Sequence, residues 1–207
     1  MNKNIDTFNL WAADGRDQKM ASNHLESVDK MIELIQERTN KLDKPFKFID
    51  LGCGNGWVVR KIVEYNNCKY AIGIDGSENM INKAKEYDIG DFELSDIELY
   101  NYKSRFDIVF SMETLYYIGN ISDLFQKLYS KAIKNNGILI IGIDHYKENK
   151  PSLNWSKEYN LDIKTLSISE WEDLFLEHGF KNIIIQQYGA KENWKGTLVI
   201  MGTKVEK

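Results

Sequence analysis

The sequence is poor in cysteine and in proline, and both shortages limit what the protein can be. Its 207 residues include two cysteines, Cys53 and Cys68, and two prolines, Pro45 and Pro151, which stand at the edges of patterned segments. Two cysteines cannot build the disulfide framework of a small secreted domain. One of them lies in a glycine-rich segment and the other is placed at the end of a predicted helix. We therefore expect free thiols and a reducing compartment.

Long hydrophobic runs are absent as well. No apolar run approaches the roughly 20 residues that a membrane-spanning helix needs. Residues 1–10 are polar and lack the apolar region of a signal peptide. The sequence thus predicts a cytoplasmic protein that has no membrane partner.

The chain also lacks an excess of positive charge. It carries 27 Lys and Arg against 31 Asp and Glu, which gives a formal net charge of −4. A protein that binds nucleic acid needs a basic surface to neutralise phosphates, and the short basic stretch 147–150 is interrupted by an acid. The charge balance argues against RNA or DNA as a partner, and the length fits one domain with a large core.

What the sequence does contain is an alternation of short apolar runs and amphipathic helical segments, which indicates β-α units on a parallel sheet. An amphipathic helix over 22–38 is expected to precede them. The predicted strands are 46–51, 70–74, 92–94, 106–110 and 138–143, and the helices between them are 57–65, 77–87 and 120–134.

The C-terminal part departs from this alternation. A capping box at Ser169 and Glu172 predicts the start of a helix that Gly179 ends, and two apolar runs follow at 182–187 and 197–201. The loop between these runs is too short for a crossover helix, so the last two strands are expected to form an antiparallel hairpin. The prediction is an α/β domain with a doubly wound seven-stranded sheet, mostly parallel, and helices on both faces.

The first predicted strand leads into a glycine-rich segment, Asp50-Leu51-Gly52-Cys53-Gly54-Asn55-Gly56, and a helix follows at once. Glycines let the backbone turn tightly and approach a ligand closely, and open parallel sheets bind nucleotide-like ligands at such a unit. Trp57 stands where the dinucleotide fingerprint needs its third glycine, and no Lys-Ser or Lys-Thr follows to make a phosphate loop. The alternative is a glycine-rich turn that binds nothing.

The pattern Asp-x-Gly-x-Gly-x-Gly after a first strand resembles motif I of the class I S-adenosylmethionine-dependent methyltransferases, in which the loop wraps the methionine part of the cofactor. The resemblance covers residues 46–145. It implies a Rossmann-like sheet, S-adenosyl-L-methionine as cofactor, and methyl transfer by in-line displacement. The cofactor contacts that it implies in this segment come from Asp50, Gly52, Gly54, Asn55 and Gly56.

Further segments match the motifs of this family in order. Asp75, which Gly76 follows, ends the second strand roughly twenty residues beyond the glycines, the spacing at which a carboxylate accepts from ribose hydroxyls. Met80 resembles the apolar residue on the adenine face, or is an ordinary core methionine. The other implied cofactor positions are Ser95, Asp96 and Ile97, where the acid would accept from the adenine amino group, and Ser111 and Met112 after the fourth strand.

The acceptor is expected at the same edge of the sheet, beyond the fourth and fifth strands. Glu113 is implied in the acceptor pocket, and His145 follows the fifth strand, where an imidazole would act as a general base. The alternative for His145 is a loop residue without a role. Three tyrosines are expected to contact the acceptor, while two further aromatic residues line either the pocket or the core. The tyrosines are Tyr116, Tyr117 and Tyr146, and the other two residues are Trp155 and Tyr159.

Residues 1–40 are expected to form a lid and a helix packed on residues 41–207, the methyltransferase domain, so that the whole chain makes one structural domain. In the family that the sequence resembles, a comparable N-terminal segment folds over the cofactor. Arg16 would then meet a carboxylate of cofactor or acceptor, and His24 would hydrogen-bond nearby. The alternative is that Trp11 fills a surface groove and both polar residues face water.

The sequence thus predicts a methyltransferase that acts on a small molecule, with no metal site, as a monomer or homodimer. The acidic balance, the lack of an Asn-Pro-Pro-Tyr-like segment and the lack of a further docking domain favour a small acceptor. The alternatives are methylation of a protein side chain or a tRNA base, or a non-catalytic subunit that binds the cofactor for a partner enzyme. Trp57 disfavours a nicotinamide oxidoreductase.

Overall fold

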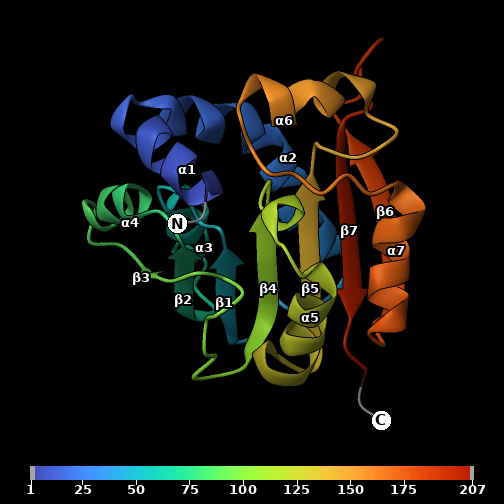
Figure 1. Cartoon of the computed structure of the whole chain (residues 1–207). Helices are drawn as coiled ribbons and strands as arrows, with labels where there is room; N and C mark the ends of the chain where they lie inside the picture. The colour runs from blue at the N-terminus through green and yellow to red at the C-terminus, as the bar shows by residue number, and fades with distance from the viewer. Residues whose placement is uncertain (1–2, 206–207) are drawn as a thin grey trace.

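The computed structural model describes residues 3–205, so the first two residues of the predicted lid and the last two of the chain lie outside the described residues. One sheet of seven strands runs through the molecule in the order β3-β2-β1-β4-β5-β7-β6 (Figure 1). Strands β1 to β5 are parallel, and β7 is antiparallel to both β5 and β6. The predicted mostly parallel sheet with a C-terminal antiparallel hairpin is confirmed. The strands are β1 (Phe46–Leu51), β2 (Cys68–Asp75), β3 (Asp91–Leu94), β4 (Phe106–Met112), β5 (Ile133–Ile143), β6 (Lys181–Tyr188) and β7 (Thr197–Thr203).

Helices cover both faces of the sheet, and each face has its own apolar core. Side chains alternate between the faces along a strand: in β1, Phe46 and Phe48 pack with α2, α3 and α4, whereas Ile49 and Leu51 pack with α5 and α7. The helices are α1 (Lys3–Ala13), α2 (Arg16–Arg38), α3 (Trp57–Val63), α4 (Glu78–Lys85), α5 (Ile121–Lys127), α6 (Trp155–Glu158) and α7 (Ile168–Glu177), and the short helical turns are η1 (Leu115–Tyr117), η2 (Leu128–Ala132) and η3 (Lys150–Asn154).

The predicted helix over 120–134 is wrong at its C-terminal end. Helix α5 ends at Lys127, a π-helical turn follows, and β5 already begins at Ile133. Ile133 pairs with Phe106 of β4, and the Lys204 ammonium donates to the Ile133 carbonyl oxygen at 3.1 Å. Strand pairing and this buried cation therefore override the helical stripe that the sequence shows in this region.

The predicted capping box is also wrong, by two residues. The chain holds two overlapping Ser-x-x-Glu patterns, and the structure uses Ser167 with Glu170 rather than the predicted pair that begins at Ser169. A helix that starts at this point places Trp171 and Phe175 in the core, so burial selects between two equivalent local signals.

Two short-range predictions near the N-terminal half also need correction. Helix α2 begins at Arg16, well before the predicted start at residue 22, and a separate helix α1 precedes it. Gly15, with φ of 82°, makes the turn between them. Cys68 begins β2 rather than ending a helix, and both cysteines are free thiols.

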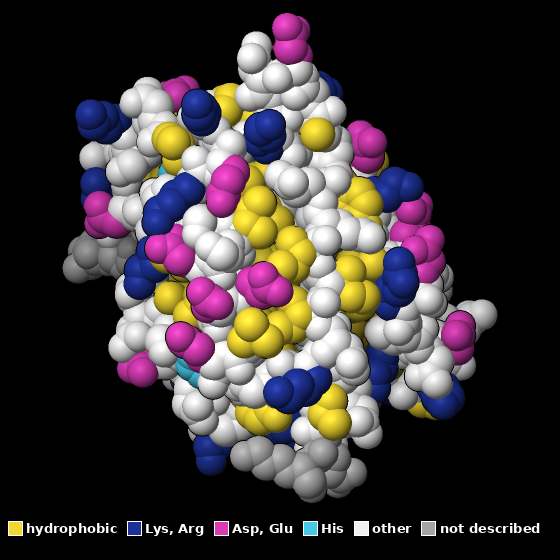
Figure 2. Space-filling model, turned by 90° about the vertical axis from the view of Figure 1, so that its right-hand side faces the viewer, with side chains coloured by type: hydrophobic (Ala, Val, Ile, Leu, Met, Phe, Trp, Pro, Cys, Tyr) yellow, Lys and Arg dark blue, Asp and Glu magenta, His cyan; other side chains and the backbone are white. Residues whose placement is uncertain are grey.

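Two features of the structure concern the distribution of charge on one face and the apolar character of the helices. On the side formed by β6 and α7, basic and acidic side chains are interspersed rather than gathered by sign (Figure 2). Among residues 3–205, no helix is both long and apolar enough to cross a membrane.

Candidate functional site

A pocket opens where the first four strands end, and its lining includes residues of α1 and α2. These two helices lie over that edge of the sheet (Figure 1). It holds about 1050 Å³ of space, part of which is open to solvent. Its lining comes from α1 and α2 and from the segments that follow β1, β2, β3 and β4. The lining residues are Asn4, Ile5, Phe8, Asp17, Met20, Ala21, His24, Asp50, Gly52, Cys53, Gly54, Asn55, Trp57, Val58, Asp75, Gly76, Met80, Asp96, Ile97, Glu98, Met112, Glu113, Thr114, Tyr117 and Ile118.

The glycines of the loop after β1 serve two different purposes. Gly52, Gly54 and Gly56 all have positive φ, of 76°, 52° and 80°, which favours glycine. A Cβ on Gly52 would lie 2.2 Å from the Thr114 hydroxyl oxygen, and one on Gly56 would lie 2.5 Å from the Phe92 ring. A Cβ on Gly54 would meet no atom within 4 Å. Gly52 and Gly56 therefore allow close packing, whereas Gly54 offers bare backbone to the pocket.

Asp75 fixes this loop from the end of β2. Its Oδ2 accepts from the Gly54 amide at 2.9 Å, and its Oδ1 accepts from the Ser77 amide at 2.8 Å. Burial raises the pKa of Asp75, although these backbone amides oppose the rise. Each carboxylate oxygen has a second lone pair for a ligand, so the loop holds Asp75 ready to accept at the pocket wall.

Most of the other predicted cofactor residues lie at this pocket. Asp50 lies next to Asp75 beneath the loop, and burial followed by the charge of Asp75 raises its pKa well above the usual value. Met80 is 3% exposed and faces both the pocket and the core. The remaining predicted cofactor residues that line the pocket are Gly52, Asn55, Gly76, Asp96, Ile97 and Met112.

Four predicted cofactor residues lie outside the lining. Gly56 packs against Phe92, and the buried Ser111 hydroxyl donates to the Leu51 carbonyl oxygen at 2.9 Å. The Ser95 amide donates to the Asp75 carbonyl oxygen at 2.9 Å. Arg16 forms an ion pair with Asp14 at 2.9 Å on the surface, and its guanidinium lies over the Trp11 ring. These four residues support the site or lie on the surface, and they do not form the pocket wall.

On the N-terminal helices, the predicted His24 lines the pocket, but sequence reasoning missed Asp17 on the same face. Asp17 accepts from Lys83 Nζ at 2.6 Å and from Asn55 Nδ2 at 2.9 Å, which ties α2 to α4 and to the glycine loop. Burial acts to raise the pKa of Asp17, but Lys83 and Asn55 outweigh it and hold the pKa below the usual value. The sequence does contain a signal for this face, because Asp17, Met20 and His24 follow the i, i+3, i+7 spacing of one helical face. The helix predicted to start at residue 22 left out the first two of these residues, so the pattern was not recognised.

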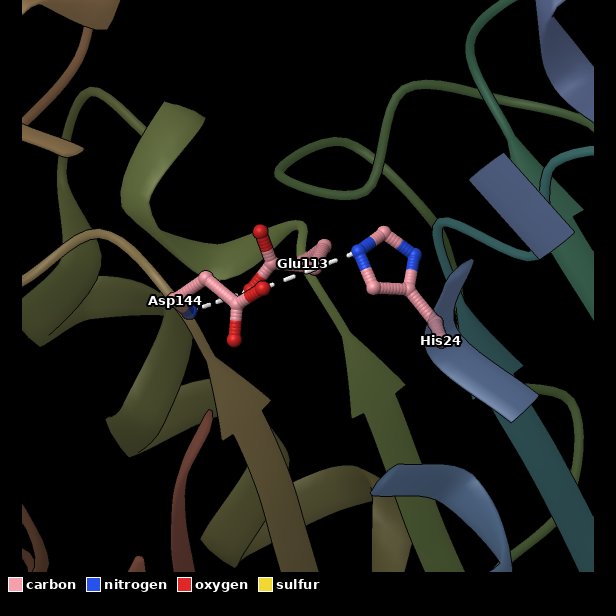
Figure 3. Close-up of side chains that lie close together, drawn as sticks. All are labelled: His24, Glu113 and Asp144. Carbon is pink, nitrogen blue, oxygen red and sulfur yellow. Dashed lines mark hydrogen bonds and ion pairs between the residues drawn. The ribbon is translucent and has the colours of Figure 1, made fainter. Parts of the chain in front are cut away.

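At the other end of the pocket, three side chains from distant segments come together: His24 of α2, Glu113 after β4 and Asp144 after β5 (Figure 3). His24 Nε2 lies 3.7 Å from Asp144 Oδ2. The Asp144 amide donates to Glu113 Oε1, and the Tyr116 hydroxyl donates to Glu113 Oε2 at 2.6 Å. Asp144 was not predicted, although its neighbour His145 was.

The electrostatics of this cluster follow from its burial. Glu113 is 9% exposed and Asp144 is 7% exposed. Burial, then the charge of Asp144, raises the pKa of Glu113 well above the usual value. Burial also raises the pKa of Asp144, against the effects of the Thr197 hydroxyl and His24, and it lowers the pKa of His24 against the charge of Asp144. Low solvation thus disfavours charge on all three groups.

The predicted general base does not reach the pocket. His145 is buried, and its Nδ1 lies 2.9 Å from the Ser152 carbonyl oxygen, which can only accept. Its Nε2 lies 2.7 Å from the Thr165 hydroxyl, and burial lowers its pKa. Both ring nitrogens are therefore engaged within the fold, away from the residues that line the pocket.

The predicted acceptor aromatics divide in a similar way. Tyr117 lines the pocket, whereas Tyr116 lies behind Glu113 and orients it. The Tyr146 hydroxyl donates to the Gly196 carbonyl oxygen at 2.9 Å and lies outside the lining. Trp155 and Tyr159 also lie outside it, in a row of rings in which Tyr159 meets Trp11 at a centroid distance of 5.5 Å.

Comparison with known proteins agrees with this geometry. A family model described as a methyltransferase domain matches residues 42–195. The malonyl-[acyl-carrier protein] O-methyltransferase of Calditerrivibrio nitroreducens is 29% identical over 172 residues, which are 80% of this chain and 62% of that protein. The ubiquinone biosynthesis O-methyltransferase of Pelagibacter ubique is 32% identical over 107 residues, 48% of this chain and 43% of that protein. The chain thus spans less than two thirds of either relative.

A solved structure has the same fold over nearly the whole chain. It belongs to a Haloferax volcanii complex between the Trm112 methyltransferase activator and a methyltransferase, with a TM-score of 0.79 and 22% identity over 96% of this chain and 98% of that one. The glycine loop, the acid at the end of β2, the sheet order and the family match point to one assignment. The chain belongs to the class I methyltransferases, whose methyl donor is S-adenosylmethionine.

Proposed function

We propose that this chain transfers the methyl group of S-adenosylmethionine to a small-molecule acceptor by in-line displacement. The observation that carries the proposal is that one pocket joins two chemically different ends. Gly54 and Asp75 lie at one end, and His24 and Glu113 lie at the other. A bound cofactor and an acceptor would therefore meet within a single pocket, which is the main demand of a displacement reaction.

The cofactor would occupy the end that the glycine loop forms. The bare backbone at Gly54 would approach its methionine part, and the fixed carboxylate of Asp75 would accept from the two ribose hydroxyls. Met80, Asp96 and Ile97 lie further along the same wall and would surround the adenine ring. The donor sulfonium would then point toward Glu113 and Tyr117.

A small acceptor fits the shape and charge of the remaining space. Helices α1 and α2 roof the pocket, so a macromolecular substrate would have to thread its reacting group beneath them. The net charge of −4 offers no general attraction for nucleic acid. The relative named for ubiquinone biosynthesis is consistent with a small acceptor, whereas the printed name of the other relative gives a malonyl group attached to a carrier protein. The two free thiols fit a cytoplasmic location.

The test has two readouts on the isolated chain. Titration calorimetry with S-adenosylhomocysteine should show one site per chain, and a panel of small hydroxy, carboxy and amino compounds should yield S-adenosylhomocysteine from S-adenosylmethionine. Glu113→Gln should lower turnover while cofactor affinity stays, because Glu113 lies at the acceptor end. Absence of cofactor binding would refute the proposal outright. Binding without turnover on any acceptor would instead indicate a cofactor-binding subunit of a partner enzyme.

A further inference from the structure

We propose that His24, Glu113 and Asp144 form a binding site for one divalent first-row transition-metal ion at the acceptor end of the pocket (Figure 3). The existence of this site is independent of the proposed function, and only its role in the reaction rests on that function.

The geometry of the three side chains suits a shared ion. Each offers one ligand atom, and these atoms lie within 4.8 Å of one another. The distance of 3.7 Å between His24 Nε2 and Asp144 Oδ2 is too long for a hydrogen bond. It is a distance that two ligands can span when each lies about 2.1 Å from the same ion. The pair is thus spaced for a common third partner rather than for direct contact.

In the part of the chain that the structure describes, the two acids of the cluster lack a Lys or Arg partner, and a metal ion could supply that positive charge. Glu113 and Asp144 are both more than nine-tenths buried, and among the described residues neither forms an ion pair with a Lys or Arg. Within residues 3–205, Asp144 Oδ1 has no hydrogen-bond partner although it is inaccessible to solvent. An unpaired buried carboxylate oxygen is costly, and a bound divalent ion would compensate two such acids at once.

The groups around the cluster hold its ligands in place, as the outer partners of metal ligands do. Tyr116 and the Asp144 amide fix the two oxygens of Glu113. Glu113 itself has φ of 55°, a conformation that is uncommon outside glycine and that clusters at functional sites. The Glu113 backbone therefore holds a conformation that is costly for a residue other than glycine.

The donor set narrows the identity of the ion. One imidazole with two carboxylates suits Zn²⁺ or Mn²⁺, whereas Mg²⁺ and Ca²⁺ prefer all-oxygen surroundings. Three protein ligands leave coordination positions open, as in catalytic metal sites. Because His24 and Glu113 both line the pocket, those open positions face the acceptor space.

The ion would select acceptors that carry an oxygen donor. A hydroxyl bound to the ion would lose its proton to water more readily. Its oxygen would then form a bond to the methyl carbon as the carbon–sulfur bond of the cofactor breaks, which gives a methyl ether and S-adenosylhomocysteine. This role deepens the proposed function by naming oxygen as the acceptor atom.

The experiment uses Mn²⁺ as the probe, with the chelator-treated full chain at one fixed pH. Electron paramagnetic resonance should show saturable binding of one Mn²⁺ per chain, and pulsed measurements should show coupling to an imidazole nitrogen. His24→Gln, Glu113→Gln and Asp144→Asn should each weaken binding by at least ~10–100-fold, the loss that even an outer partner of a metal ligand causes. His24→Gln should also abolish the nitrogen coupling, and Tyr116→Phe should weaken binding by roughly tenfold.

Two controls keep the result interpretable. His178→Ala removes a histidine that hydrogen-bonds at the end of α7 and should leave Mn²⁺ binding intact. Unchanged affinity for S-adenosylhomocysteine in each variant shows that the fold survives. The metal site would be overturned if the parent chain showed no saturable Mn²⁺ binding, or if His24→Gln and Asp144→Asn bound Mn²⁺ as tightly as the parent chain. Either result would leave the proposed function standing. Mn²⁺ binding without methyl transfer to any acceptor would support the metal site and would count against the proposed function.

Discussion

The two ends of the pocket are built in different ways. Most of the proposed cofactor end comes from one continuous stretch, residues 50–80, to which Asp96 and Ile97 are added. It relies mainly on backbone: glycines at positive φ and amides that hold Asp75. The acceptor end gathers side chains from residues 24, 113 and 144. A site made of backbone depends on a few positions that no other residue type can fill. A site made of distant side chains can change its ligand through single substitutions, so chemistry can diversify at one end while the donor stays the same.

The largest expected effect that would test this contrast is at Gly54. Gly54→Val places a branched side chain in space that is open in the protein and that the cofactor would fill. Overpacking costs about 1–3 kcal/mol, so affinity for S-adenosylhomocysteine should fall by up to about a hundredfold in calorimetry. Gly189→Val is the matched control, because Gly189 also has positive φ with nothing within 4 Å and lies outside the pocket. Equal affinities in the two variants would contradict a backbone-made site.

Asp75 is the side chain of residues 50–80 that should contribute most to cofactor binding. Asp75→Ala removes the acceptor of the Gly54 and Ser77 amides as well as that of the ribose. Hydrogen bonds to a charged group contribute about 1.5–3 kcal/mol, which predicts a loss of roughly tenfold to hundredfold in cofactor affinity. Asp91→Ala, at the exposed start of β3, should change nothing. A parental dissociation constant in Asp75→Ala would reduce Asp75 to a strand-end acid.

Asp17, which ties α2 to α4 and to the glycine loop, should affect the stability of the fold. The expected effect of its substitution is smaller than those at Gly54 and Asp75. Asp17→Asn breaks the 2.6 Å pair with Lys83, whose side chain is 29% exposed and can turn to water, so unfolding free energy should drop by about 1–2 kcal/mol. Because the folded pKa lies below the usual 3.8, the stabilisation is full at neutral pH and is lost as pH falls through that range. Urea unfolding at pH 7 and at pH 3 measures the loss of unfolding free energy and its dependence on pH. Glu33→Gln, in an exposed pair with Lys30, should cost under ~0.5 kcal/mol. A loss for Asp17→Asn as small as this, or one that is no smaller at pH 3 than at pH 7, would contradict the prediction.

The smallest expected effect on activity is at His145, which follows β5 yet belongs to neither end of the pocket. His145→Gln should keep turnover within about twofold of the parent, whereas loss of a general base would lower it by roughly 10²–10⁴. Stability should still fall by about 1–2 kcal/mol, because two buried hydrogen bonds are disturbed. A large loss of turnover in a stably folded His145→Gln variant would instead indicate that His145 acts in catalysis.

The contrast between the two ends also explains what the sequence could predict. The glycine loop and Asp75 lie within one strand–loop–helix–strand unit, so local pattern and spacing found them. The acceptor cluster requires knowledge of which segments meet. Asp144 and His145 show the difficulty, since adjacent side chains after a strand point in different directions and the sequence alone favoured the histidine. Tyr116 and Tyr117 divide in the same way. The two overlapping capping patterns near Ser167 could be separated only by the burial of Trp171.

Helix α1 contacts both ends of the pocket, and this has a consequence for the order of events in turnover. Asn9 of α1 accepts from the Ser77 hydroxyl at 2.7 Å on the cofactor side. Asn4 exchanges hydrogen bonds of 2.9 and 2.8 Å with the backbone of Asp162, in the segment whose Lys164 amide donates to the Tyr116 carbonyl oxygen. A movement of α1 large enough to admit one ligand therefore loosens the site of the other. We expect arrival and departure to be kinetically coupled, with one opening event in each catalytic cycle releasing both products.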